Sequence, residues 1–208
     1  MDQNALKGVY AITDDILTPP DTILEKVSEA LHGGVKIIQL RDKKSNDIGL
    51  IEVCSEIRSL CKSHNALFII NDRVELTKKI RADGVHVGFH NLSVPETRAI
   101  LGKDFIIGVS CYGDIRRAKK VEKEGADYAA FGAFFSSPTK PEANVISMDI
   151  IKQAKSQLKI PVCVIGGIKK ENIKQLIPYN PDMYAMVSSI FEGDSVYSNA
   201  KQISSMIC

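Results

Sequence analysis

The sequence lacks the features of a membrane, secreted or nucleic-acid-binding protein. None of its apolar runs approaches the roughly 20 residues that span a bilayer. The first residues, MDQNALKG, lack the basic and apolar regions of a signal peptide. The formal net charge is only +2, and the lysines are spread along the chain instead of forming a basic block. We therefore expect a cytoplasmic protein that binds neither membranes nor nucleic acid.

The cysteines also lack a recognisable pattern. There are 5 of them, with no C-x-x-C pair and no metal-ligand spacing to the 4 histidines. We expect reduced thiols in place of disulfides. Cys54 and Cys61 lie seven residues apart in a helical stretch, which predicts that both are buried as small apolar side chains.

What the sequence does contain is a repeated apolar segment. Eight short runs are rich in valine, isoleucine and aromatic residues and are apolar nearly throughout. Such runs are typical of parallel strands that are covered on both faces. The runs are GVYAIT (8–13), VKIIQLR (35–41), ALFIIN (66–71), GVHV (84–87), FIIGVS (105–110), YAAFG (128–132), IPVCVIGG (160–167) and MYAMVSS (183–189).

Amphipathic helical stretches separate these runs, with apolar residues at steps of three and four. Eight alternations of strand and helix predict a (β/α)8 TIM barrel, although 208 residues is near the short end of its size range. An open doubly wound sheet is the alternative, but no switch point is evident. Because no linker or low-complexity run interrupts the pattern, we expect a single domain over residues 1–208.

Barrels of this kind build their sites at the carboxyl ends of the strands, where this sequence gathers polar residues. Arg41, Lys43 and Lys140 come from separate loops and could surround a polyanion, and hydroxyls at Ser137 and Thr139 would complete a phosphate cradle. A second phosphate could bind at Gly166-Gly167, where a helix is expected near Lys170, and at the serines after the last strand. The other polar residues at strand ends are Gln39, Asn71, Asp72, His90, Asn91, Ser110, Ser188 and Ser189.

Several of these residues also have purely structural interpretations. Asp72 with Glu75, and Ser93 with Glu96, fit the spacing of a helix capping box. Asn91 alone would be an ordinary loop or cap residue. His86 lies inside the fourth predicted strand, where a hydrogen-bonded core histidine is expected more often than a catalytic one.

Taken in order, the strand-end motifs resemble those of the thiamine phosphate synthase family. The resemblance runs through nearly the whole chain. The motifs are Y-x-I-T-D (10–14), QLRDK (39–43), INDR (70–73), GVHVG (84–88), IGVS (107–110), FG followed by TK (131–140), IGGI (165–168) and VSS (187–189).

The resemblance implies a transferase that joins hydroxymethylpyrimidine diphosphate to thiazole phosphate, or to its carboxylated form, and gives thiamine phosphate and diphosphate. It assigns the pyrimidine to Gln39, and a magnesium ion to Asp72, with Asn91 where a second acidic ligand is usual. Stabilisation of the departing diphosphate makes Arg41, Lys43, Ser110 and Lys140 the expected catalytic residues. The diphosphate would bind Arg41, Lys43, Asn71, Ser110 and Lys140, and the thiazole phosphate would bind Ser137, Thr139, Gly167, Val187 and Ser188.

The sequence departs from the family pattern at three places: at Asn91, at Tyr112, and at SSPTK (136–140), which replaces the commoner P-T-x-T-K while Ser137 keeps a hydroxyl. Asn91 loses one negative charge, so we expect either weaker metal binding or a site that His90 biases toward another divalent ion. Tyr112 stands where related thiazole tautomerases carry an acid/base histidine, and Asn71-Asp72 is retained, so the synthase is favoured over the tautomerase. A third interpretation is a barrel that binds thiamine precursors without turnover. The sequence leaves open whether the protein forms a homo-oligomer.

Overall fold

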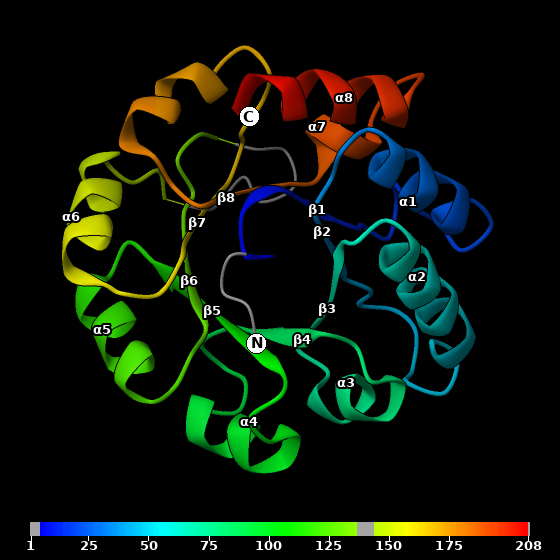
Figure 1. Cartoon of the computed structure of the whole chain (residues 1–208), viewed down its shortest axis with the longest axis horizontal. Helices are drawn as coiled ribbons and strands as arrows, with labels where there is room; N and C mark the ends of the chain where they lie inside the picture. Colours follow the sequence, from blue (N-terminus) through cyan, green and yellow to red (C-terminus); the bar gives the residue numbers. More distant parts are fainter. Residues whose placement is uncertain (1–4, 137–143, 208) are drawn as a thin grey trace.

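The computed structural model describes residues 5–136 and 144–207, so the predicted site residues Ser137, Thr139 and Lys140 lie outside the described residues. Eight parallel strands close into a barrel in chain order, each paired with its neighbours in sequence and β1 with β8 (Figure 1). The predicted barrel is confirmed. The strands are β1 Gly8–Ile12, β2 Ile37–Leu40, β3 Leu67–Asn71, β4 Gly84–Val87, β5 Ile106–Tyr112, β6 Tyr128–Phe131, β7 Val162–Ile165 and β8 Met183–Met186.

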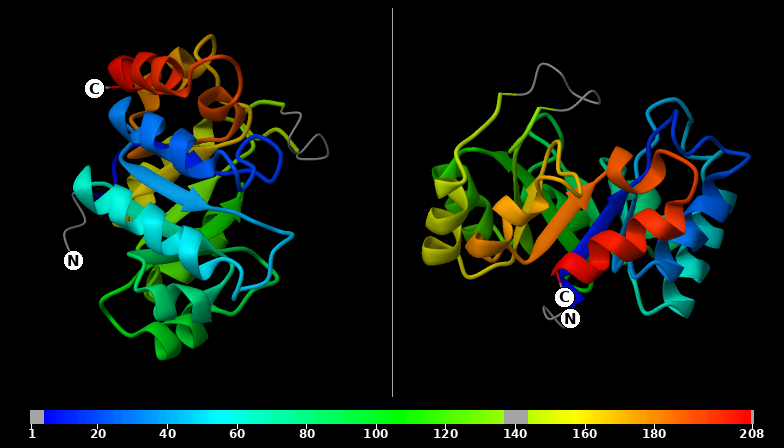
Figure 2. Two further views of the ribbon diagram at one scale, coloured as in Figure 1. Left: turned by 90° about the vertical axis from the view of Figure 1, so that its right-hand side faces the viewer. Right: turned by 90° about the horizontal axis from the view of Figure 1, so that it is seen from above.

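Helices surround the barrel on its outside (Figure 1). In the view from above, the start of β1 and the end of the last helix lie at the same end of the barrel (Figure 2). The helices are α1 Ile23–His32, α2 Ile51–Ser63, α3 Val74–Ile80, α4 Val94–Leu101, α5 Ile115–Lys123, α6 Asp149–Gln157, α7 Ser188–Phe191 and α8 Val196–Ile207. Within the described ranges, no helix has the length and apolar character that crossing a membrane requires.

The connection between β7 and β8 differs from the sequence prediction. Instead of a regular helix starting near Lys170, it contains two short 3-10 turns, η2 Ile173–Gln175 and η3 Ile177–Tyr179. The prediction of a regular helix there is wrong. Pro178 lies in the first turn of η3, where its missing N–H is tolerated, and Asn180 ends that turn in a left-handed conformation, with φ of 50°.

The apolar residues form two layers on either side of the barrel wall. One cluster fills the barrel interior and includes Tyr10, Ile37, Ile69 and Tyr128. The larger cluster lies between the outer face of the strands and the helices. This arrangement explains why the strands are apolar nearly throughout, since alternate residues face different cores and neither face meets water.

Three aspartates fasten the end of the barrel opposite the strand carboxyl termini. Asp83, Asp127 and Asp182 directly precede β4, β6 and β8. Each carboxylate accepts a hydrogen bond from a backbone N–H near the start of the neighbouring strand, which is β3, β5 or β7 respectively. The bonds are Phe68 N to Asp83 at 2.7 Å, Ile107 N to Asp127 at 2.7 Å and Val162 N to Asp182 at 2.8 Å. Asp127 also pairs with Arg98, at 2.7 Å.

We predict that Asp127→Ala lowers the free energy of unfolding by about 1–3 kcal/mol, because it leaves a buried N–H without its acceptor. Denaturant unfolding followed by circular dichroism measures the change. The matched control is Asp104→Ala, which removes an exposed carboxylate. Equal stabilities of the two variants would show that the aspartate contributes nothing to closing the barrel.

Candidate active site

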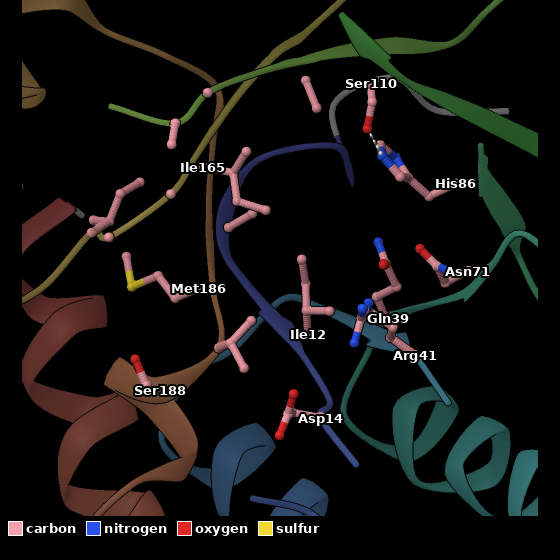
Figure 3. Close-up of a pocket in the computed structure, with 18 of the residues that line it drawn as sticks. Ile12, Asp14, Gln39, Arg41, Asn71, His86, Ser110, Ile165, Met186 and Ser188 are labelled. Atoms are coloured by element: carbon pink, nitrogen blue, oxygen red, sulfur yellow. Dashed lines mark hydrogen bonds between the residues drawn. The ribbon is translucent and has the colours of Figure 1, made fainter. Parts of the chain in front are cut away.

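A cavity of about 210 Å³ opens at the carboxyl ends of the strands. Figure 3 shows Gln39, Asn71, His86 and Ser110 on one side of it and Met186 and Ser188 on another. Seven predicted site residues line it: Gln39, Arg41, Asn71, Ser110, Gly167, Val187 and Ser188. Lys43, Asp72 and Asn91 are outside its lining and lie on the loops above.

The position of Arg41 is fixed by a threonine at the end of β1. The hydroxyl of Thr13 accepts a hydrogen bond from the Arg41 backbone N–H at 2.8 Å and donates to the Arg41 carbonyl at 3.3 Å. Thr13 is only 1% exposed and lines the same cavity. The sequence analysis missed Thr13, although its place directly after the first strand could have identified it.

The loop that carries Lys43 is braced by Arg73, which the sequence places at the start of α3. The Arg73 guanidinium donates to the carbonyl oxygens of Asp42 at 3.0 Å and Ser45 at 2.6 Å, and it also pairs with the carboxylate of Asp47. The side chain is 21% exposed. Arg73 therefore holds the loop after β2 against the loop after β3.

Asp72 pairs with Lys43 instead of capping α3. The first residue before the helix is Arg73, no side chain caps that end, and Asp72 has a positive φ of 64°. The capping-box interpretation of Asp72 is therefore wrong. The other capping box is confirmed, since the Ser93 hydroxyl accepts from the Glu96 N–H while the Glu96 carboxylate accepts from the Ser93 N–H.

Asn91 folds the loop after β4 back on itself. Its side-chain oxygen accepts a hydrogen bond from the Gly88 N–H at 2.6 Å. A carbonyl oxygen has two lone pairs, so this bond leaves one for a further ligand. Arg117 supports the same loop, because its guanidinium lies 4.9 Å from the centroid of the Phe89 ring and donates to the Ser110 carbonyl at 2.9 Å.

In residues 5–136 and 144–207, no cluster of three or more His, Cys, Asp or Glu side chains could hold a metal ion by itself. Magnesium differs from most metals in using one or two carboxylates, several waters and phosphate oxygens of the substrate. Asp72 offers a carboxylate, and Asn91 offers the amide oxygen described above. These residues fit a magnesium ion that takes its other ligands from a phosphate and from water.

On the opposite side of the cavity, backbone groups replace charged side chains. Gly166 and Gly167 follow β7 with φ values of 100° and 62°. A Cβ atom at Gly167 would meet the carbonyl oxygens of Ser136 and Phe135. Val187 and Ser188 follow β8, and Ser188 begins the short helix α7. The chain thus brings together the two strand ends at which the sequence predicts the second phosphate.

His86 makes two hydrogen bonds inside the barrel, to the Tyr128 hydroxyl and to the Ser110 hydroxyl, each at 2.9 Å. The interpretation as a hydrogen-bonded core histidine is confirmed. Its ring also lines the cavity, which the sequence does not predict because the position of an inward-facing residue depends on strand register.

The described cysteines are buried free thiols, as expected. Burial raises the pKa of Cys54, Cys61 and Cys111 to about 12, so these thiols stay protonated near neutral pH. A thiol in that state is a poor nucleophile. These three thiols are therefore unsuited to act as nucleophiles.

Together the fold and the cavity define a (β/α)8 barrel whose mouth presents an arginine, amides and hydroxyls suited to an anionic ligand. Known proteins of the same kind match nearly the whole chain. The family described as thiamine monophosphate synthase matches residues 9–190. The thiamine-phosphate synthase of Wolinella succinogenes is 40% identical over 97% of this chain and 94% of its own. That of Nitrosomonas eutropha is 40% identical over 100% of this chain and 98% of its own.

Among solved structures, a thiamine phosphate pyrophosphorylase from Pyrococcus furiosus matches with a TM-score of 0.89 and 32% identity, covering 99% of this chain and 96% of its own. The chain belongs to the thiamine monophosphate synthase family, which confirms the resemblance found in the sequence. A 3-hexulose-6-phosphate synthase with 17% identity and a TM-score of 0.69 shares the fold.

We predict that Gly167→Ala destabilises the protein more than Gly125→Ala. Both glycines have positive φ, but only at Gly167 would the new methyl group meet backbone atoms; at Gly125 nothing lies within 4 Å. Backbone strain alone costs about 1–3 kcal/mol at either position, so the difference in unfolding free energy isolates the crowding. A smaller loss at Gly167 than at Gly125 would contradict the close packing of this loop.

Proposed function

We propose that the chain is a thiamine-phosphate synthase, a transferase that joins hydroxymethylpyrimidine diphosphate to thiazole phosphate and releases diphosphate. The strongest support is that the family match covers the strand ends lining the cavity. The two sides of that cavity also differ chemically, since arginine, amide and hydroxyl groups lie on one side and glycine backbone on the other.

The diphosphate would bind on the side formed by the loops after β2, β3 and β5. Arg41, Asn71 and Ser110 line the cavity there, and Lys43 is half-exposed above it. Arginine and lysine are the side chains best suited to hold phosphate oxygens. Lys140, predicted for the same role, lies outside the described residues.

The pyrimidine would bind deeper, against Gln39, whose side chain is buried and whose amide nitrogen donates to Tyr10 at 2.6 Å. The thiazole phosphate would bind across the cavity at Gly167, Val187 and Ser188. Ser137 and Thr139, predicted for that phosphate, lie outside the described residues. This arrangement would place the thiazole nitrogen opposite the carbon that carries the diphosphate.

In the reaction, the bond between the methylene carbon of the pyrimidine and the diphosphate oxygen breaks, and its electron pair leaves with the diphosphate. The thiazole nitrogen then donates its lone pair to the resulting pyrimidine cation. The protein contributes by holding the two reactants in line and by stabilising negative charge on the leaving group. Arg41, Lys43 and the Ser110 hydroxyl would supply that stabilisation, and no protein nucleophile is needed.

A magnesium ion would neutralise further charge on the diphosphate, held by Asp72 and Asn91. Binding it requires Asp72 to exchange its pair with Lys43 for the metal. Both side chains of that pair are solvent-accessible, at 48% for Lys43 and 26% for Asp72, and such exposed pairs contribute only about 0–1 kcal/mol. The exchange is therefore inexpensive. A cytoplasmic location and association into a homo-oligomer stay predictions.

The direct test is to incubate the purified protein with both substrates and magnesium and to measure thiamine phosphate and released diphosphate. Product that requires both substrates supports the proposal. A folded protein that binds the substrates without forming product would instead indicate a non-catalytic binder.

We predict that Arg41→Gln lowers kcat/KM for the pyrimidine substrate by about 10²–10³-fold, the usual cost of removing one charge-stabilising donor. Steady-state kinetics at saturating thiazole phosphate measures the effect. Arg116→Gln is the control, because this arginine is 95% exposed on α5. Similar kinetics for the two variants would remove Arg41 from the diphosphate site.

We also predict that Asn91→Asp lowers the magnesium concentration needed for half-maximal activity. The added charge should strengthen metal binding about tenfold, which corresponds to about 1.4 kcal/mol. Magnesium titration of the initial rate measures this, with Asp72→Asn as the opposite case that raises the requirement. An unchanged magnesium dependence in both variants would contradict these metal ligands.

A further inference from the structure

A continuous row of hydrogen bonds crosses the interior of the barrel below the cavity. The Gln39 amide nitrogen donates to the Tyr10 hydroxyl at 2.6 Å, and the Tyr10 and Tyr128 hydroxyls are 2.9 Å apart. The Tyr128 hydroxyl lies 2.9 Å from His86 Nδ1, and His86 Nε2 lies 2.9 Å from the Ser110 hydroxyl. Figure 3 shows the last of these bonds at the wall of the cavity. We refer to these five residues as the polar row.

The polar row is buried within an otherwise apolar core. Tyr10 is 1% exposed, Tyr128 is fully buried and Gln39 is 2% exposed. Around them the barrel interior is filled by residues such as Ile37 and Ile69. An unpaired polar group in such surroundings costs about 1–3 kcal/mol, so each hydroxyl is held to the partners that the row provides.

Space for the row comes from a glycine on β5. A Cβ atom at Gly108 would overlap the ring of Tyr128. The missing side chain lets the Tyr128 ring lie across the barrel interior, stacked on the His86 ring with centroids 5.6 Å apart. Residues from β1, β2, β4, β5 and β6 therefore meet in one row.

The orientation of the Gln39 amide, whose nitrogen donates to Tyr10, gives the row a direction. Burial raises the pKa of both Tyr10 and Tyr128 well above its usual value, so each remains a neutral hydroxyl with one hydrogen to donate. Tyr10 accepts from Gln39 and therefore donates to Tyr128. Tyr128 then donates to His86 Nδ1, which must be the unprotonated nitrogen of the ring.

The direction determines which groups the two ends present to a ligand. With Nδ1 accepting, the neutral His86 ring carries its proton on Nε2 and donates to the Ser110 oxygen. The Ser110 hydrogen is then available to donate into the cavity. At the other end, the Gln39 amide directs its nitrogen toward Tyr10, which leaves its carbonyl oxygen as the acceptor for a ligand.

We infer that the polar row makes Tyr10, Tyr128 and His86 positioning residues that set the hydrogen-bonding polarity of both ends of the pyrimidine diphosphate site. Gln39 is fixed as an acceptor for the amino group of an aminopyrimidine, and Ser110 is fixed as a donor to a phosphate oxygen. The inference rests on the proposed function for the identity of the ligand. The direction of the row is a property of the protein alone.

The Gln39 carbonyl oxygen distinguishes two kinds of pyrimidine. It can accept a hydrogen bond from an amino group, but it repels an oxo oxygen at the same ring position. A site built around a buried hydrogen bond rejects ligands that leave the bond unmade, because the buried group stays unpaired. The site should therefore favour the aminopyrimidine over its deaminated oxo analogue. Tyr128→Phe would relax this preference, because Tyr10 would lose its acceptor and could donate to the Gln39 oxygen after a flip of the amide.

The first experiment measures the tautomer of His86 in the ligand-free protein. Heteronuclear NMR of histidine-labelled protein distinguishes a protonated ring nitrogen from an unprotonated one, and His86→Gln assigns the signals. We expect the proton on Nε2, with Nδ1 unprotonated, near neutral pH. A proton on Nδ1 would reverse the direction of the row and overturn the inference.

The second experiment compares Tyr128→Phe with Tyr184→Phe. Tyr184 is a buried tyrosine of β8 that faces the outer core and has no part in the row. We expect Tyr128→Phe to raise KM for the pyrimidine substrate about tenfold or more, at the cost of about 1.4 kcal/mol of binding, with KM for thiazole phosphate unchanged. Inhibition by the oxo analogue should become stronger relative to the aminopyrimidine. Tyr184→Phe should change neither preference nor KM.

The outcomes separate the two proposals. If Tyr128→Phe lowers the melting temperature but leaves the amino-to-oxo preference as in the unmodified protein, the row is only structural and the inference is wrong. If the unmodified protein forms no thiamine phosphate, the proposed function fails, and with it the assignment of the ligand. The His86 tautomer still decides the direction of the row in that case.

Discussion

Closure of eight parallel strands into one barrel is the constraint on which the rest of the structure depends. Closure turns every second residue inward, into a space too narrow for anything but side chains. Lower inward positions are filled by apolar and aromatic residues such as Ile37 and Tyr128. The highest inward positions hold Gln39, Asn71, His86 and Ser110, which form the floor of the cavity. The floor of the candidate active site is thus the uppermost layer of inward-facing residues, and this layer is polar.

The sequence predicted the strands well because buried parallel strands leave a continuous apolar run, and the ends of those runs located Gln39, Arg41 and Ser110 at the cavity. Two local predictions were wrong: two short 3-10 turns replace a regular helix before β8, and Asp72 pairs with Lys43 instead of capping α3. The tyrosine hydroxyls were missed for a different reason. A tyrosine within an apolar run has no sequence signal for its partner, and only strand register brings Tyr10 and Tyr128, 118 residues apart, within hydrogen-bond distance.

The loops above the barrel also depend on residues whose side chains bind the loop backbone. Thr13 holds the backbone of Arg41, and Arg73 joins the loop of Lys43 to the start of α3. Both side chains hydrogen-bond to backbone groups of these loops. By contrast, the Lys43–Asp72 pair is exposed and weak. The mouth therefore combines a rigid frame with two charges that can change partners.

A side chain at position 108 would overlap the Tyr128 ring, so these two positions, on β5 and β6, constrain each other during evolution. A side chain larger than hydrogen at Gly108 requires a smaller residue at position 128. A smaller residue at position 128, in turn, leaves a void over Gly108 and removes a hydroxyl from the barrel interior. Neither substitution is neutral alone, so the two positions can vary only as a pair and in a fixed order, with the reduction of residue 128 coming first. Evolution of the barrel interior is therefore constrained at two positions that do not line the cavity.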